Sequence, residues 1–307
     1  MAILVVGSVA LDSIRSPYGY VERALGGSAT FFALAASYFA DVRMIGVVGE
    51  DFTPQDEEMF RQRGIDTRGI ERAPGKTFHW SGEYGENPNE VTTRETDLNV
   101  FEKFQPKIPA SYLDSEYLFL GNIDPVLQIE VHRQMKTAKL VALDTILYWI
   151  ERAPKQLAEA IKNVGMMIIN ESEARQFAGD HNLLRASGKI LAMGPKALVI
   201  KHGEYGATIF FREKQFGFGK HPFRAPALPL DEVRDPTGAG DAFAGGFMGY
   251  IASQAKLTPE VLKRAMFYGG VMGGFAVERF GTERLLSLTR DEIEARFQIF
   301  RQMTHLE

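Results

Sequence analysis

The chain has 307 residues, of which 45% are hydrophobic and 24% charged, and its formal net charge at pH 7 is −4. This near balance, with both signs spread along the chain, argues against a nucleic-acid-binding protein, which usually carries a basic stripe. The absence of cysteine excludes disulfides, thiolate metal sites and cysteine nucleophiles, and the six histidines show no metal-binding spacing. No stretch reads as a signal peptide or a membrane span, so we expect a cytoplasmic protein with no membrane partner.

Short apolar runs alternate with helical patterns along most of the chain. Strands are expected near 3–8, 42–49, 117–121, 140–144, 166–170 and 197–201, and helices near 28–40, 56–64, 125–137 and 152–163, with two short ones between 171 and 192. Apolar strands that alternate with helices indicate a parallel sheet covered on both faces. Ligands of such sheets gather at the carboxyl ends of the strands, where Asn170 and Lys201 stand.

Residues 76–100 break this rhythm. Aromatic and β-branched residues alternate with polar ones there, and NPN supplies a turn, which predicts a two-stranded antiparallel piece. Residues 12–24 could pair with it to form a small β-layer. The pattern alone leaves two interpretations open, a lid over a site or a plain surface hairpin. Trp80 and Tyr84 in this layer could cover a substrate or fill a dimer interface.

The stretch DPTGAGDAF (235–243) places glycines directly before an apolar run. A helix that begins at Gly238, or one residue earlier, would leave the N–H groups of Gly238, Ala239 and Gly240 without intrahelical partners. The helix dipole adds partial positive charge there, and the small side chains let a phosphate approach the amides. Asp241 would repel a phosphate, but it suits a base that takes a proton from a hydroxyl. The alternative is an ordinary helix start in which Asp241 is favourable first-turn charge.

Several segments together resemble one family. DPTGAGDAFAGGF resembles the carboxyl-terminal signature of the PfkB/ribokinase family of ATP-dependent carbohydrate and nucleoside kinases. Residues 25–52 resemble the family's glycine-pair region, IINESEA (168–174) carries its Asn-x-x-Glu motif, and VIKHGEYGA (199–207) resembles its nucleotide-side strand and glycine turn. These segments occur in the family's order across essentially the whole chain.

The resemblance implies a fold. We expect a single kinase domain over residues 1–307 with a ribokinase-like three-layer α/β/α architecture. A central, mostly parallel sheet of about eight strands would carry a small β-sheet lid, formed by about 12–24 and 76–100.

The resemblance also implies a reaction, the transfer of the γ-phosphoryl group of ATP to an alcohol of a small acceptor. By similarity, Asp241 is the base that activates the acceptor hydroxyl, and Gly238, Ala239 and Gly240 form the anion hole. Phosphoryl transfer depends on positioning and charge neutralisation more than on covalent help. The implied nucleotide-binding residues are Lys201, Gly203, Gly206, Thr237 and Gly240, with an adenine pocket within 266–282.

Asn170 and Glu173 stand where a strand enters a helix. Mg²⁺ prefers carboxylates, waters and phosphate oxygens, so one carboxylate and one amide suit an ion held mostly by ATP and water. The alternative for Glu173 is favourable charge in a first helical turn. The resemblance favours the metal role, acting through water, and leaves dependence on a monovalent cation open.

The acceptor side is implied by residues near the amino terminus. Asp12 could bind substrate hydroxyls or be a turn residue, and the resemblance favours the former. Gly26, Gly27 and Ser28 would bring backbone close to the acceptor and so form part of its binding site, and Ser28 is also a candidate helix cap. Many sugar kinases of the family carry an asparagine about five residues after the first glycine, where this chain has Phe31. A phenyl ring cannot make the asparagine's hydrogen bonds, although it could pack against an apolar ring or be core.

Three activities therefore stay in view. The first is a kinase for a small sugar-like acceptor, and the second is a nucleoside kinase with an adenosine-kinase-like acceptor. The third is a catalytically weak nucleotide- or sugar-binding sensor, against which the retained Asp241 and the Asn-x-x-Glu motif argue. A dinucleotide-dependent oxidoreductase is excluded because no G-x-G-x-x-G follows the first strand. A homodimer formed through the lid is a further expectation.

Overall fold

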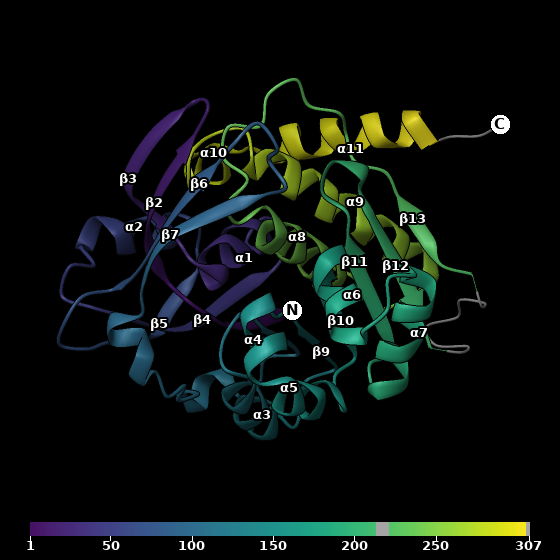
Figure 1. Ribbon diagram of the computed structural model, residues 1–307. Coiled ribbons are helices and arrows are strands. Elements are labelled where there is room, and N and C mark those ends of the chain that lie inside the picture. Colours follow the sequence, from purple (N-terminus) through teal and green to yellow (C-terminus); the bar gives the residue numbers. More distant parts are fainter. Residues whose placement is uncertain (213–220, 305–307) are drawn as a thin grey trace.

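The computed structural model describes residues 1–212 and 221–304. Figure 1 shows a central sheet between two sets of helices, with a smaller sheet beside it. From edge to edge, the nine strands of the central sheet are β13 (Phe223–Ala225), β12 (Ala207–Phe211), β11 (Ala197–Lys201), β10 (Met166–Asn170), β9 (Leu140–Leu143), β8 (Tyr117–Leu120), β1 (Ala2–Val6), β4 (Asp41–Val48) and β5 (Asp66–Arg72).

The strands from β5 through β11 run parallel, and only β12 and β13 are antiparallel to their neighbours. The expectation of a mostly parallel sheet is therefore confirmed. Parallel pairing brings the carboxyl ends of these strands to one edge of the sheet. Asn170 at the end of β10 is paired there with Lys201 at the end of β11. Asp144 follows the last residue of β9 at the same edge.

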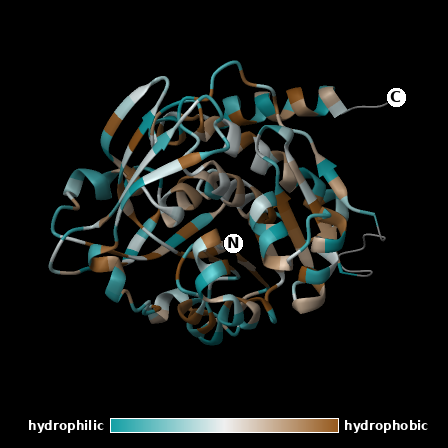
Figure 2. Ribbon diagram, in the orientation of Figure 1, coloured by the Kyte–Doolittle hydropathy of each residue, from teal (hydrophilic) through white to brown (hydrophobic). Residues whose placement is uncertain are grey.

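Two hydrophobic cores lie on the two faces of the sheet. In β1, Ile3 and Val5 belong to one core, and Leu4 and Val6 to the other, as the alternation of side chains in a strand requires. Figure 2 shows the strongest hydrophobicity along the central strands. The first core is covered by α1 (Ser28–Ala36), α2 (Pro54–Gln62), α8 (Ala239–Ser253), α9 (Pro259–Ala276), α10 (Glu283–Ser287) and α11 (Arg290–Thr304). The second is covered by α3 (Pro125–Gln134), α4 (Leu147–Arg152), α5 (Pro154–Ile161), α6 (Glu171–Ala178) and α7 (Leu183–Met193).

The small sheet has the order β3 (Gly19–Gly26), β2 (Ala10–Ser16), β6 (Phe78–Tyr84) and β7 (Val91–Asp97). The antiparallel β6–β7 pair and its pairing with β2 confirm the arrangement expected from the sequence. Six of the seven β2 residues are buried, whereas all of β7 is exposed. The small sheet therefore packs on the body through β2 and presents β7 to solvent.

One local expectation is wrong, and one helix was not expected. The helix expected over 152–163 is confirmed as α5, whereas the short helix α4 before it was not expected; Pro154 cannot continue α4 and instead begins α5. Ser28 does not cap α1, because Gly27 with φ 92° is the capping residue and the Ser28 hydroxyl is bonded elsewhere. Among the described residues, no helix is both long and apolar enough to cross a membrane.

Candidate active site

The glycine turn before α8 is held in place by a buried carboxylate. Asp235 is fully buried, its Oδ1 accepts a hydrogen bond from the Thr237 N–H at 2.9 Å, and its Oδ2 accepts one from the Gly281 N–H at 2.7 Å. Gly238 caps the helix with φ 72°, and a Cβ there would lie 2.2 Å from the Phe31 ring. Both the backbone angle and the space therefore require glycine at this position.

The amides of this turn are not equivalent. The Ala239 N–H donates to the Pro236 carbonyl at 3.2 Å. Within residues 1–212 and 221–304, the N–H groups of Gly238 and Gly240 have no hydrogen-bond partner. A Cβ at Gly240 would lie 2.8 Å from Lys201 Nζ, so an ammonium group stands directly beside this turn. The turn is thus an anion site in which Gly238 and Gly240 offer the free donors.

Three carboxylates surround this ammonium group. Lys201 Nζ lies 3.2 Å from Asp144 Oδ2, and the charges of Glu173 and Asp241 also act on it. Burial lowers the pKa of Lys201, but the attraction of the three carboxylates outweighs burial and leaves that pKa raised. Lys201 is therefore held as a cation among three carboxyl groups.

The carboxyl group of Asp241 can gain or lose a proton near neutral pH. Its carboxyl is half-buried in the first turn of α8 and makes no hydrogen bond to any described residue. Burial, followed by the charge of Asp144, raises its pKa to about 7, although Lys201 opposes the shift. An unpartnered carboxyl of this pKa beside free amides fits a general base.

Asp144 is a site residue that the sequence analysis missed. Its carboxyl is only slightly exposed, and Oδ1 accepts a hydrogen bond from the Thr145 N–H at 2.7 Å. Burial raises its pKa, while Lys201 pulls the pKa down. The signal was present in LVALD, because an acid directly after an apolar strand stands at the same sheet edge as Asn170 and Lys201.

Asn170 and Glu173 form a reciprocal cap at the start of α6. Asn170 Oδ1 accepts a hydrogen bond from the Glu173 N–H at 2.9 Å, and Glu173 Oε2 accepts one from the Asn170 N–H at 2.8 Å. Burial, followed by the charge of Asp144, raises the pKa of Glu173 to about 8. One carboxyl oxygen of Glu173 is left over after capping, so the structural role and a metal role are compatible.

Asp12 faces the same site from the small sheet. It is buried, and its Oδ1 has no hydrogen-bond partner among the described residues. Burial, followed by the charge of Asp235, raises its pKa to about 8. Asp12 lies opposite Trp80 in the β2–β6 register, so both side chains share one face of the small sheet. Tyr84 lies on β6, as Trp80 does, and its Oη is 3.1 Å from Thr237 Oγ1. This contact joins the small sheet to the glycine turn.

The first glycine of the pair lies close to Asp12. A Cβ at Gly26 would lie 2.0 Å from Asp12 Oδ2. The Ser28 N–H donates to Ser8 Oγ at 3.0 Å, and the Ser28 hydroxyl accepts from the Ser8 N–H at 3.2 Å. Phe31 is 1% exposed beneath Gly238, so its position favours support of the turn over direct contact with an acceptor.

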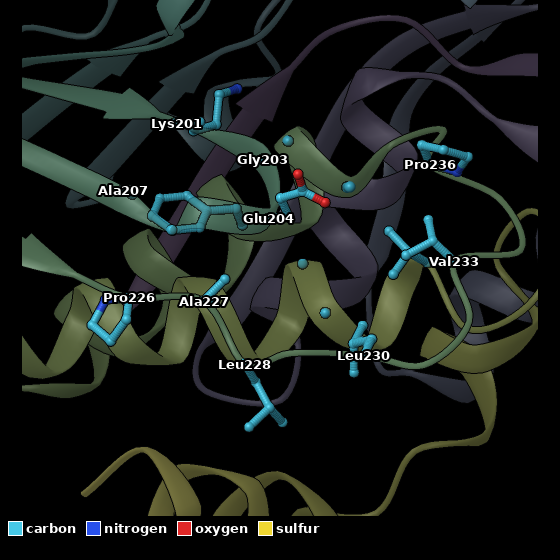
Figure 3. A pocket seen from close by; sticks show the side chains of 18 of the residues that line it. Lys201, Gly203, Glu204, Ala207, Pro226, Ala227, Leu228, Leu230, Val233 and Pro236 are labelled. Carbon is cyan, nitrogen blue, oxygen red and sulfur yellow. The ribbon is translucent and has the colours of Figure 1, made fainter. Parts of the chain in front are cut away.

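A cavity of about 440 Å³ lies beside the glycine turn (Figure 3). Of the residues expected on the nucleotide side, Lys201, Gly203, Gly206 and Gly240 line it, whereas Thr237 does not. In Figure 3, Lys201 lies away from Leu228 and Leu230, so the end of the cavity at Lys201 is charged and the end at the two leucines is apolar. The expected adenine segment contributes Met266, Gly270, Gly273, Gly274 and Val277.

One part of the cavity wall was not identified in the sequence analysis. The apolar loop APALPL (225–230) lines the cavity along its whole length. Its alternation of proline with small and branched residues could have indicated an extended apolar wall. An apolar slot that leads to an ammonium group and free amides suits a ligand with a flat ring at one end and anionic groups at the other.

Known proteins share this architecture. The family model described as pfkB family carbohydrate kinase matches residues 2–288. A cytidine kinase of Thermococcus kodakarensis is 31% identical over 256 residues, which is 80% of this chain and 87% of the relative. The nucleoside kinase structure of Methanocaldococcus jannaschii has a TM-score of 0.76 at 18% identity, covering 97% of this chain and 98% of that one. The structure of a Burkholderia thailandensis nucleoside kinase in complex with ADP-inosine has a TM-score of 0.79 at 21% identity, covering 97% of this chain and 95% of that one.

Proposed function

This chain belongs to the pfkB family of carbohydrate kinases, and we propose that it is a nucleoside kinase in which Asp241 is the general base. It is an ATP-dependent kinase that transfers a phosphoryl group to an alcohol of a sugar-like or nucleoside acceptor. The single observation that carries the role of Asp241 is its unpartnered carboxyl in the first turn of α8, next to free amides.

The proposed step starts with the acceptor hydroxyl beside Asp241. Asp241 takes the hydroxyl proton as the oxygen attacks the γ-phosphorus of ATP. The bond between the γ-phosphorus and its bridging oxygen breaks, and ADP leaves. The N–H groups of Gly238 and Gly240 point from the helix start toward the charge on the transferring group, and Lys201 adds a fixed positive charge. Asp144 holds Lys201 in position through their 3.2 Å contact.

We include Mg²⁺ in the proposal because the charges fit it. Three carboxyl groups act on a single ammonium group at this site, those of Asp144, Glu173 and Asp241, so carboxyl groups outnumber cations there, and Glu173 keeps one oxygen free after capping. Carboxylate oxygens and water are the ligands that Mg²⁺ prefers. When bound with ATP, Mg²⁺ neutralises phosphate charge. Glu173, with Asn170 beside it, would hold the ion through water.

The acceptor side favours a nucleoside. Asp12 offers an unpartnered carboxyl oxygen for ribose hydroxyls, and Trp80 on the same face offers a flat ring for a base. Phe31 in place of the asparagine found in many sugar kinases removes a polar contact to a free sugar. The 31% identity to a cytidine kinase supports cytidine as the first acceptor to test.

The test is ADP release with Mg·ATP across cytidine, other nucleosides, sugars and cyclitols. We expect one nucleoside to stimulate turnover, and Asp241→Asn to lose about 10²-fold or more while still binding ATP. Asp231→Asn, an exposed aspartate on a loop, is the matched control and should keep full activity. Stimulation by a sugar alone would contradict the nucleoside acceptor, and full activity of Asp241→Asn would contradict the general base. ATP binding without any turnover would instead favour the sensor.

Three further expectations stay part of this proposal. A homodimer through the small sheet is supported by β7 (Val91–Asp97), an edge strand that is exposed at every residue and therefore offers unpaired backbone groups. Sedimentation at several concentrations tests it. A cytoplasmic location fits an ATP-consuming kinase. Dependence of the reaction on a monovalent cation would be seen as a difference in turnover rate between potassium and sodium salts.

A further inference from the structure

The turn between β6 and β7 reaches from the small sheet to the nucleotide cavity. At the end of β6, where the turn begins, the Tyr84 hydroxyl contacts Thr237 beside the glycine turn. Within the turn, Pro88 and Asn89 line the same cavity as Lys201. One hairpin therefore contacts both the glycine turn and the nucleotide cavity.

Asn89 contacts a residue close to Lys201 in that cavity. A Cβ at Gly203 would lie 2.2 Å from Asn89 Oδ1, so the two residues are in direct contact. Gly203 follows Lys201 by two residues, and Lys201 Nζ lies beside Gly240 of the anion site. In Figure 3, Lys201 and Gly203 share one part of the cavity, away from Leu228. The contact with Gly203 therefore places Asn89 on the side of the cavity where Lys201 lies, next to the anion site.

The side chain of Asn89 is available while its backbone is fixed. The Asn89 N–H donates to Asn87 Oδ1 at 3.0 Å, which sets the turn. Its carboxamide has no hydrogen-bond partner within residues 1–212 and 221–304. The amide nitrogen is farther from Gly203 than the oxygen is, so the donor side of the group is the side turned away from that contact. An amide N–H₂ group is a suitable donor to a phosphate oxygen.

We propose that Asn89 is a nucleotide-binding residue that the small sheet supplies, donating from its carboxamide to a phosphate oxygen of the bound nucleotide. This inference rests on the proposed kinase function. It makes the small sheet part of both substrate sites, because the hairpin that carries Trp80 and Tyr84 over the acceptor also carries Asn89 to the phosphates. Nucleotide affinity then depends on the position of this hairpin.

The test measures the dissociation constants of ATP, ADP and adenosine by calorimetry for the full chain and its variants. Asn89→Ala should weaken ATP and ADP about tenfold, the usual size for a hydrogen bond to a charged group, and leave adenosine unchanged. Asn89→Asp should weaken ATP further because its charge repels phosphate. Glu86→Ala is the control, because Glu86 is exposed in the same turn but does not line the cavity.

The outcomes separate this inference from the function on which it rests. If the wild-type chain binds and turns over ATP but Asn89→Ala binds ATP equally well, Asn89 has no such role and the kinase proposal stands. Equal weakening of adenosine and ATP would place the contact on the nucleoside part and overturn the phosphate assignment. Failure of the wild-type chain to bind ATP would overturn both. An unchanged melting midpoint in each variant shows that the fold is intact.

Discussion

Replacing Asp12 by asparagine is expected to stabilise the protein, and increasingly so as the pH rises. Asp12 is 3% exposed, its Oδ1 has no partner among the described residues, and burial raises its pKa to about 8. The unfolded chain gives up this proton near its ordinary pKa of 3.8, whereas the folded protein holds it to about 8. Between these values the unfolded state binds fewer protons, so rising pH lowers the free energy of unfolding.

The size of the effect follows from the two pKa values. Between pH 5 and pH 9, the cost of keeping this carboxyl buried grows by about 4 kcal/mol for a folded-state pKa of about 8. Asparagine has a similar shape and does not ionise, so Asp12→Asn removes this pH-dependent cost. The same change removes the acceptor contact, so we also expect a loss of turnover.

The assay is urea unfolding of wild type and Asp12→Asn at several pH values without substrates. The quantity of interest is the difference in unfolding free energy between the two proteins, in which the other titrating groups cancel to first order. It should grow by several kcal/mol from pH 5 to pH 9. Asp231→Asn, at an exposed position, should show no such trend. A difference for Asp12→Asn that stays constant with pH would refute the reasoning, because the carboxyl would then not be buried in a protonated form.

The remaining predictions concern the active site. Turnover should fall below about pH 7, because Asp241, whose pKa burial raises to about 7, must be ionised to accept a proton; the residual rate of Asp241→Asn should lack this dependence. Gly238→Ala should lower the free energy of unfolding, measured in urea, by about 3 kcal/mol or more, because φ of 72° is unfavourable for alanine and the new Cβ would clash with Phe31. Gly179→Ala should lower it by only about 1 kcal/mol, because φ there is 58° but the new Cβ would lie in open space. Glu173→Gln can keep the α6 cap, so it should raise the Mg²⁺ concentration needed for half-maximal turnover without lowering the melting midpoint; a drop in the midpoint alone would favour the purely structural role.

Local pattern determined much of this protein. The expected strands 166–170 and 197–201 have the same bounds in β10 and β11, because uninterrupted apolar runs are buried on both faces of a parallel sheet. The glycine turn before α8 was also predictable, since its requirements are local: a left-handed residue at Gly238 and free amides at a helix start. The antiparallel β6–β7 pair of the small sheet followed from alternation and turn residues in the same way.

The tertiary structure decided which of these residues meet and what their charges become. Asp144 was overlooked because only the neighbouring strands place it against Lys201, and the raised pKa of Asp241 depends on both. Phe31 lies beneath Gly238, more than 200 positions later in the chain, so no local pattern could show that its ring supports the turn. Asn89 meets Gly203 only because the small sheet folds over the body. Sequence specifies elements through short-range geometry, whereas burial and charge coupling arise from contacts between distant segments, which exist only once the chain has folded.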